Sequence, residues 1–220
     1  MKAMVLAAGR GERMGALTAD RPKPLLEIGS VSLIERHLQR LAASGVEEAV
    51  VNLSYRGAQI RERLGDGERF GLAIRYSDEG EPPLETAGGI VRALPLLGAA
   101  PFLLVNADVF TDFDFDALTR DPRSALVLVP NPAHHLRGDF GSDESGLVRA
   151  APPLSTYGGI AVLDPKLFAG LADGRRPLKP VLDEAIARRE LRAVHYRGLW
   201  LDVGTPERLD EARRIVAARS

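Results

Sequence analysis

The sequence predicts an α/β protein of three layers, in which helices cover both faces of a mostly parallel sheet. Two observations indicate this: short apolar runs alternate along the chain with stretches of helical periodicity, and the first apolar run ends in a glycine-rich loop. Strands buried on both faces read as continuous apolar runs, and a βαβα order is typical of a parallel sheet. The 220 residues suffice for one domain with a substantial core, so we expect a single domain over residues 1–220.

Local signals in the chain predict the individual elements. Ser32 and Glu35 have the spacing of a helix-capping box, and apolar residues recur behind them at helical spacing until Gly45 ends the helix. Further helices are expected at 58–64, 88–97, 178–189 and 206–218. Strands are expected at 3–8, 48–53, 72–76, 101–105, 125–130, 159–163 and 191–195, whereas the pattern loosens between residues 131 and 156.

Composition excludes several classes of protein. The formal net charge of −1 and the low aromatic content of 5% argue against nucleic-acid binding. The absence of cysteine excludes disulfides and thiolate metal sites. No stretch approaches the roughly 20 apolar residues of a membrane span, and the first residues reach glycine too soon for a signal peptide. We therefore expect a cytoplasmic protein without membrane or nucleic-acid partners, either a monomer or a small homo-oligomer.

The first 26 residues contain the most informative motif. An apolar strand delivers the loop from Gly9 to Gly11, and Lys23 follows between two prolines. A glycine-rich loop at the carboxyl end of a strand presents backbone N–H groups to polyphosphates. Because Arg13 and Lys23 add positive charge, the segment predicts a site for a nucleoside triphosphate.

Two familiar glycine motifs do not fit this loop. The Walker A sequence is absent, and the dinucleotide fingerprint has Met14 where its third glycine should stand, with Gly15 one residue late. An NAD-dependent oxidoreductase is therefore disfavoured. A plain strand-to-helix turn would explain Gly9 and Gly11 but not the Pro-Lys-Pro sequence that follows.

The pattern L-A-A-G-x-G-x-R followed by P-K-P resembles the amino-terminal signature of the sugar-1-phosphate nucleotidylyltransferases. The matching residues are Leu6, Ala7, Ala8, Gly9, Gly11, Arg13, Met14 and Lys23. The resemblance implies a Rossmann-like nucleotidyltransferase fold, similar to glycosyltransferase A, and assigns the loop to the nucleotide. It also implies that Lys23 contacts the α-phosphate or the sugar phosphate, and that Arg13 contacts the pyrophosphate end as a second catalytic residue.

Two aspartates are candidate metal ligands. Asp108 follows an apolar strand, and Asp202 stands among apolar residues in the sequence W-L-D-V-G-T-P. An unpaired carboxylate in such surroundings is costly, although Asp108 could instead be a helix or turn cap and Asp202 a buried hydrogen-bond acceptor. Both match motifs of the family, so the resemblance implies that they bind Mg²⁺ together with substrate phosphates. Zinc is disfavoured because cysteine is absent and His134 and His135 lack zinc-ligand spacing.

Residues 81–89 resemble the family segment that packs against the nucleobase. Thr86 and Gly88 match that segment and are expected at the nucleotide, whereas Glu85 stands where the family has glycine. A glycine-rich helix start capped by Thr86 would also account for the sequence.

The sugar-binding E-K-P motif of the family is missing. Residues 131–140 instead read N-P-A-H-H-L-R-G-D-F, which resembles one subgroup, the N-acetylmuramate-1-phosphate uridylyltransferases. The residues expected at the sugar are Asn106, Arg137, Gly158 and Gly159. A solvated loop for the two histidines and a strand bulge at the two glycines are the alternatives.

The resemblance implies a reaction of UTP with N-acetylmuramate 1-phosphate, with Mg²⁺ as cofactor, in peptidoglycan recycling. The alternatives are another hexose or heptose 1-phosphate with GTP or dTTP, or a nucleotide-sensing domain of the same fold without turnover.

Overall fold

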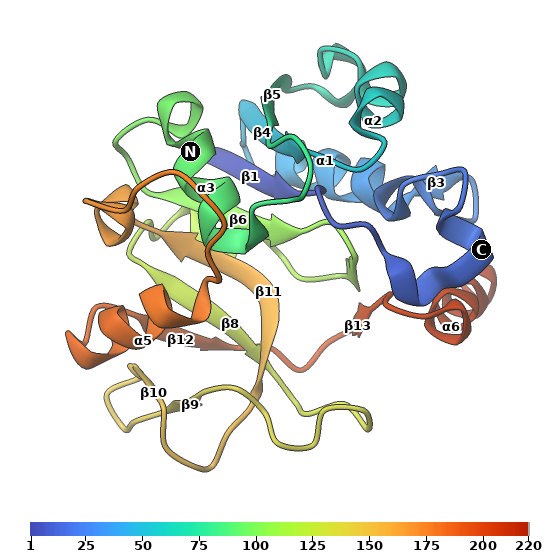
Figure 1. Ribbon diagram of the computed structural model, residues 1–220. Helices are drawn as coiled ribbons and strands as arrows, with labels where there is room; N and C mark the ends of the chain where they lie inside the picture. The colour runs from blue at the N-terminus through green and yellow to red at the C-terminus, as the bar shows by residue number, and fades with distance from the viewer. Residues whose placement is uncertain (220) are drawn as a thin grey trace.

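A seven-stranded sheet forms the centre of the protein, in the order β12-β8-β11-β6-β1-β4-β5 (Figure 1). The computed structural model describes residues 1–219. The strands are β1 (Lys2–Leu6), β4 (Glu48–Leu53), β5 (Ala73–Asp78), β6 (Phe102–Asn106), β8 (Ala125–Val129), β11 (Thr156–Leu163) and β12 (Arg192–His195). Only β11 runs antiparallel to its neighbours in this sheet. The prediction of a mixed, mostly parallel sheet is confirmed.

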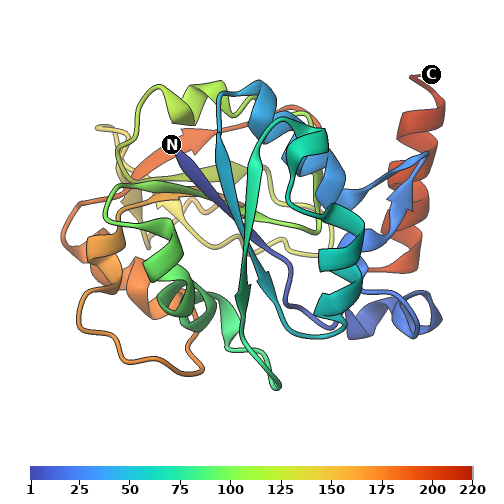
Figure 2. The ribbon, with the colours of Figure 1, turned by 90° about the horizontal axis from the view of Figure 1, so that it is seen from above.

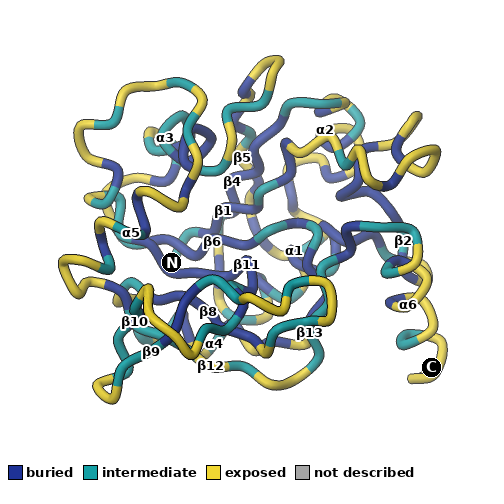
Figure 3. Tube along the Cα trace, turned by 60° about the horizontal axis from the view of Figure 1, so that its bottom comes forward, coloured by how far each residue is buried: buried dark blue, intermediate teal, exposed yellow. Residues whose placement is uncertain are grey.

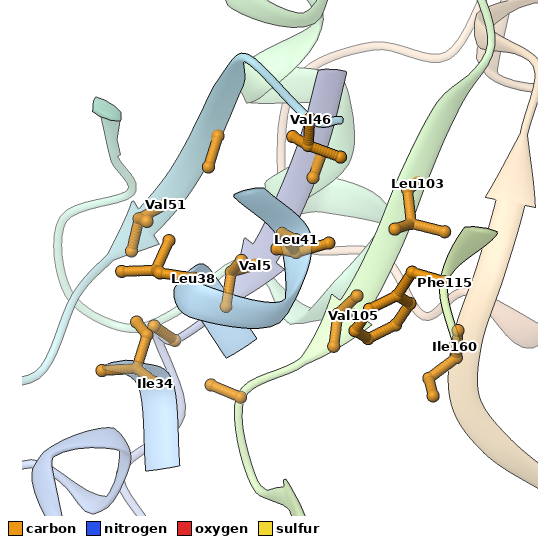
Figure 4. Packing of buried hydrophobic residues seen from close by; sticks show 14 of the residues in the cluster. Val5, Ile34, Leu38, Leu41, Val46, Val51, Leu103, Val105, Phe115 and Ile160 are labelled. Atoms are coloured by element: carbon orange, nitrogen blue, oxygen red, sulfur yellow. The ribbon is translucent and has the colours of Figure 1, made fainter. Parts of the chain in front are cut away.

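Helices cover both faces of this sheet. The main ones are α1 (Leu33–Ala43), α2 (Gly57–Leu64) and α4 (Asp116–Thr119) on one face, and α3 (Glu85–Leu97) and α5 (Lys179–Ala187) on the other. Alternate residues of each strand enter different cores, so Val5 packs in the α1 cluster and its neighbour Met4 in the α3 cluster. Figure 4 shows Leu38 and Leu41 of α1 beside Val5. In Figure 3 the inner strands β1, β4, β6, β8 and β11 are mostly buried, whereas the edge strands β5 and β12 include exposed residues. Helices pack on both faces of the sheet, so the three-layer prediction is confirmed.

The capping box at the start of α1 is present. The backbone N–H of Ser32 donates to Oε2 of Glu35 at 3.0 Å, and the Ser32 hydroxyl donates to the same oxygen at 2.7 Å. Glu35 is buried and also accepts hydrogen bonds from Arg63 and Arg69 on the following segment. The helix ends at Ala43, and Gly45 follows with a φ of 76°. The cap therefore joins this helix to its neighbour as well as starting it.

Several short elements were not predicted. The pair β7 (Val109–Thr111) and β13 (Trp200–Asp202) is antiparallel. The helix α6 (Pro206–Ala217), which the sequence did predict, packs behind this pair over Phe110 and Val203. Figure 2 shows α6 on the opposite side of the molecule from α5. The remaining short elements are η1 (Glu12–Thr18), η2 (Lys23–Leu25), β2 (Glu27–Ile28), β3 (Val31–Ser32), η3 (Glu68–Phe70), β9 (Gly141–Ser142), β10 (Val148–Arg149) and η4 (Pro165–Phe168). Elements of two or three residues are too short to show a periodicity.

Three boundaries differ from the prediction for identifiable reasons. The first strand ends at Leu6 because the Ala7 N–H leaves the ladder and donates to Oδ1 of Asn52 at 2.7 Å. The helix α3 begins at Glu85, and its cap position is Leu84 and not Thr86. The strand β11 begins three residues early, and its register with β8 shifts inside residues 157–161. The bulge considered at the two glycines is therefore present.

Within residues 1–219, no helix combines the length and apolarity needed to cross a membrane.

Candidate active site

A cleft of about 550 Å³ opens at the carboxyl ends of β1, β4, β5 and β6. This is the edge at which open α/β sheets bind ligands. Ten of the predicted site residues line the cleft: Leu6, Ala7, Ala8, Gly9, Gly11, Arg13, Lys23, Thr86, Asn106 and Asp108. Five do not line it: Gly88, Arg137, Gly158, Gly159 and Asp202.

Gly11 allows the glycine loop to close over Lys23. Its φ of 67° lies in the left-handed region, and an added Cβ would stand only 2.9 Å from Cβ of Lys23. The Met14 N–H then donates to the Gly11 carbonyl at 2.9 Å and starts the turn that holds Arg13. A larger residue at position 11 would push the loop and the lysine apart.

Lys23 and Asp108 form an ion pair in the floor of the cleft. Nζ of Lys23 donates to Oδ2 of Asp108 at 2.6 Å, and the side chains are 9% and 34% exposed. Pro22 is extended, with φ −68°, and Pro24 follows within the short turn η2, so the lysine backbone has little freedom. A lysine this deeply buried needs a compensating charge, and Asp108 provides it.

The antiparallel pair β7–β13 brings the backbone of Asp202 next to that of Asp108, although the Asp202 side chain does not line the cleft. The Val203 N–H donates to the Asp108 carbonyl at 2.8 Å, so Asp202 lies next to Asp108 across the two strands. Oδ1 of Asp202 accepts a hydrogen bond from Nη1 of Arg208 at 2.8 Å and lies 3.0 Å from Nε2 of His134. Asp202 is therefore a hydrogen-bond acceptor that is partly exposed, with Arg208 and His134 beside it.

Arg208 and His134 were not predicted as site residues. Arg208 stands in the first turn of α6, six residues after Asp202, and the capping of α6 by Thr205 turns the chain back so that its guanidinium reaches the aspartate. The short distance in sequence from W-L-D-V-G-T-P is the signal that could have found it. His134 comes from a segment far away in the sequence, and the solvated-loop interpretation misses its contact with Asp202.

The two carboxylates suit a magnesium ion. The contacts to Lys23 and Arg208 use Oδ2 of Asp108 and Oδ1 of Asp202, so they do not involve the other oxygen of either carboxylate. Mg²⁺ in phosphate-binding sites is usually held by one or two carboxylates plus phosphate oxygens and water. Among residues 1–219 there is no group of three or more His, Cys, Asp or Glu side chains that could hold a metal.

Two guanidinium groups meet at the same end of the cleft. A Cβ added to Gly204 would stand 3.1 Å from Nη2 of Arg13 and 2.5 Å from Nη2 of Arg208. With Lys23, these residues place three cations around the glycine loop and the two aspartates. This end of the cleft is suited to phosphate groups.

A buried network fixes the other end of the cleft. Nδ2 of Asn52 donates to Oε1 of Glu79 at 2.6 Å, and the Leu84 N–H donates to Oε2 at 2.7 Å. Because Asn52 also holds the Ala7 N–H, the network ties the glycine loop to the segment before α3. This end of the cleft is therefore held in place by hydrogen bonds between buried side chains and the backbone.

Gly88 packs against a loop and does not face the cleft. An added Cβ would lie 2.3 Å from the Gly174 carbonyl oxygen, and the Gly88 N–H donates to the Arg176 carbonyl at 3.1 Å. The glycine therefore allows residues 174–176 to sit on the first turn of α3. Thr86, in the same turn, does line the cleft.

Gly158 and Gly159 lie behind Asn106. An added Cβ on Gly159 would be 2.7 Å from Nδ2 of Asn106, and the Gly158 carbonyl accepts a hydrogen bond from Nε1 of Trp200 at 2.9 Å. The two glycines allow β11 to approach Asn106. Asn106 lines the cleft, whereas the glycines do not.

Arg137 is exposed on the loop 131–139. Two side chains fix this loop to the start of β11: Oδ1 of Asn131 accepts from the Thr156 hydroxyl at 2.9 Å, and Oδ2 of Asp139 accepts from the Tyr157 N–H at 2.8 Å. The loop thus reaches Asp202 through His134 and not through Arg137.

Comparisons with known proteins show which family the chain belongs to. Residues 2–127 match the family described as nucleotidyl transferase. The N-acetylmuramate alpha-1-phosphate uridylyltransferase of Neisseria meningitidis serogroup B is 45% identical, over 99% of each chain. The enzyme of the same name from Caulobacter vibrioides is 38% identical, over 93% of this chain and 92% of its own. A crystal structure of a putative glucose-1-phosphate thymidylyltransferase from Bacillus anthracis, in complex with a sucrose, superposes with a TM-score of 0.84 at 18% identity, over 98% of this chain and 94% of its own, and so supports the fold.

Proposed function

Because the chain belongs to the nucleotidyl transferase family, we propose that it makes UDP-N-acetylmuramate and pyrophosphate from UTP and N-acetylmuramate 1-phosphate. The names of the two relatives support the choice of substrates. The observation that carries the reaction type is the Lys23–Asp108 pair, at 2.6 Å, in the floor of a cleft that also holds the glycine loop. The proposal assigns the whole chain to one catalytic domain.

The reaction joins the sugar phosphate to the α-phosphate of UTP. An oxygen of the sugar 1-phosphate attacks the α-phosphorus, the new P–O bond forms, and the bond to pyrophosphate breaks with the electron pair leaving on oxygen. Lys23 is the residue best placed to offset charge on the α-phosphate, and Arg13 the residue for the departing pyrophosphate. Such a site works by positioning its substrates and by fixed charge, with little covalent chemistry of its own.

Asp108 and Asp202 are the residues that would hold Mg²⁺, which when bound supplies neutralisation of the phosphate charge. The glycine-loop residues Leu6, Ala7, Ala8, Gly9 and Gly11 are proposed to receive the phosphates and ribose. Thr86 is proposed for the base side of the cleft.

The sugar is proposed to lie between Asn106 and the loop 131–139. N-acetylmuramate carries a lactyl carboxylate, and a carboxylate is costly to desolvate without a cation. Arg137 remains our proposed partner for this group, since a guanidinium binds a carboxylate through two parallel hydrogen bonds. Its exposure on a fixed loop leaves the guanidinium free to turn toward a sugar bound beside Asn106.

A screen of pyrophosphate release tests the proposed function. UTP, CTP, GTP and dTTP are each combined with the 1-phosphates of N-acetylmuramate, N-acetylglucosamine, glucose and mannose, with and without Mg²⁺. We expect the fastest release from UTP with N-acetylmuramate 1-phosphate, only with Mg²⁺, and almost none from Asp108→Asn. Fastest release from GTP with mannose 1-phosphate would favour the hexose alternative, and no release from any pair would indicate a nucleotide-sensing domain.

A further inference from the structure

Glu85 has a backbone conformation that is unfavourable for any residue with a side chain. It is the first residue of α3 and has a φ of 60°, in the left-handed region. A residue other than glycine loses on the order of 1 kcal/mol there. Glycine adopts this conformation without strain, so the conformation itself does not need a glutamate. The chain accepts this cost for a side chain that lines the cleft.

The side chain of Glu85 pairs with Arg175. Oε1 of Glu85 lies 2.8 Å from Nε of Arg175, and both residues line the same end of the cleft. The two side chains are 37% and 67% exposed, and exposed ion pairs contribute little to stability. A gain in stability therefore does not account for the strained glutamate.

The loop that bears Arg175 is fixed to the start of α3. The Arg176 N–H donates to the Leu84 carbonyl at 2.8 Å, and the Arg176 carbonyl accepts from the Ala87 N–H at 3.0 Å. Nη2 of Arg92 holds Asp173, at the other end of the loop, at 2.6 Å. Arg175 is thus carried by a backbone that is already in place before a ligand binds.

This docking also determines which polar groups remain for a ligand. The Ala87 and Gly88 N–H groups would otherwise be free donors at the start of a helix, but both are taken by the Arg176 carbonyl. The hydrogen-bonding groups left at this end of the cleft include the Glu85 carboxylate and the terminal nitrogens of Arg175. They present an acceptor beside a donor.

We propose that Glu85 and Arg175 read the edge of the nucleobase. The inference rests on the proposed function, because phosphates bound at Lys23 direct the base toward the other end of the cleft. Uracil presents its N3–H beside the C4 carbonyl, which complements a carboxylate beside a guanidinium. Cytosine presents a bare ring nitrogen beside an amino group, so both contacts become repulsive. Guanine shares the pattern of uracil and adenine that of cytosine, so the pair separates uracil and guanine from cytosine and adenine.

Equilibrium binding of UTP and CTP, measured by titration calorimetry with Mg²⁺ and without sugar phosphate, tests the pair. The wild type should bind UTP more tightly than CTP. Glu85→Gln and Glu85→Gly should each reduce the ratio of the two Kd values by about tenfold or more, the scale of a charged hydrogen bond. Arg175→Ala should reduce the ratio in the same direction.

Two features of the design keep the test sharp. Glu85→Gly suits the left-handed backbone, so this variant should be no less stable than the wild type. Glu184→Gln is the matched control, since Glu184 is also ion-paired with an arginine, on the exposed side of α5, and does not line the cleft. It should leave both affinities unchanged.

The outcomes separate this inference from the proposed function. Equal affinity of the wild type for UTP and CTP would overturn the base-reading role. A folded Glu85→Gly variant whose ratio of Kd values for CTP and UTP stays within twofold of the wild-type ratio would also overturn it. Selective UTP binding that is lost in the Glu85 variants supports it, even if the pyrophosphate screen finds no turnover with any sugar phosphate and the proposed reaction fails.

Discussion

Nζ of Lys23 donates a hydrogen bond to Oδ2 of Asp108 over 2.6 Å, so the residue proposed to contact the α-phosphate and the one proposed to hold Mg²⁺ are direct partners. Each group offsets the charge of the other in the floor of the cleft. Substrate phosphates and a dication bring charges of both signs into the cleft. Lys23 can then pair with a phosphate and Asp108 with the dication, so neither charge is left without a partner.

The Lys23–Asp108 contact predicts strongly non-additive effects. Lys23→Ala and Asp108→Asn should each lower kcat by several orders of magnitude, and the double variant should lose far less than the product of the two, because the residues act as a unit. The measurement is kcat for the four proteins at saturating substrates and Mg²⁺. Strictly multiplicative losses would show that the two residues act independently.

Stability should distinguish the two single variants. Asp108→Asn leaves the more buried charge without its partner, so it should cost about 1 to 3 kcal/mol of unfolding free energy. Lys23→Ala leaves a carboxylate that is 34% exposed, which water can solvate, and should cost less. Urea unfolding of both variants gives the comparison.

Arg208 should oppose metal binding while it assists turnover. Its Nη1 lies 2.8 Å from Oδ1 of Asp202, so a dication bound at this carboxylate meets a nearby positive charge. Nη2 of Arg208 and Nη2 of Arg13 both lie close to Gly204, at the end of the cleft proposed for the phosphates. Arg208→Ala should therefore bind Mn²⁺ more tightly in an EPR titration and yet have a lower kcat. Weaker Mn²⁺ binding would show instead that Arg208 orients Asp202 for the metal.

Acid should destabilise the protein through Glu35. Burial raises the pKa of this carboxyl, but hydrogen bonds from Arg63, Ser32 and Arg69 outweigh it and lower the pKa from 4.5 to about 2. The contribution to stability is complete above the unfolded pKa near 4.5 and is lost as the pH falls toward 2, roughly 3 kcal/mol in all. Glu35→Gln should be less stable at pH 7 but should lose less stability between pH 4.5 and pH 2. Unfolding free energies across this range test the prediction, and profiles of equal slope for the two proteins would contradict it.

Arg137 should affect the choice of sugar and little else. If it binds the lactyl carboxylate, Arg137→Ala should reduce the preference for N-acetylmuramate over N-acetylglucosamine 1-phosphate by about tenfold or more in kcat/KM. Because the side chain is exposed, the variant should fold as the wild type does. An unchanged preference would remove Arg137 from the sugar site and leave His134 as the nearest residue of its loop to Asp202.

Local signals were sufficient for most of the fold. The Ser32–Glu35 capping box and the apolar strands could be read directly, because each depends on neighbouring residues. The strands β7 and β13 could not, since three residues carry no period and their pairing depends on contacts between segments far apart in the sequence. That pairing places Asp202 beside Asp108, so the sequence predicted both carboxylates but not their contacts.

The candidate site shows the same division. Lys23 and Asp108 were identified separately by their motifs, whereas their ion pair, and the contact of His134 with Asp202, arise from tertiary structure. Gly88 shows the reverse case, because its motif indicated the nucleotide, whereas a Cβ added at this position would meet the Gly174 carbonyl oxygen. A motif residue therefore indicates which part of the fold forms the site, but it does not show which groups its own side chain contacts.

The most direct measurement is the ratio of kcat/KM for N-acetylmuramate 1-phosphate and N-acetylglucosamine 1-phosphate in the wild-type enzyme, with UTP and Mg²⁺, each product being identified by mass spectrometry. We predict that UDP-N-acetylmuramate forms and that the muramate phosphate is preferred by at least about tenfold, the scale of one charged hydrogen bond. An equal rate with both sugars, or a preference for N-acetylglucosamine 1-phosphate, would contradict the proposed function.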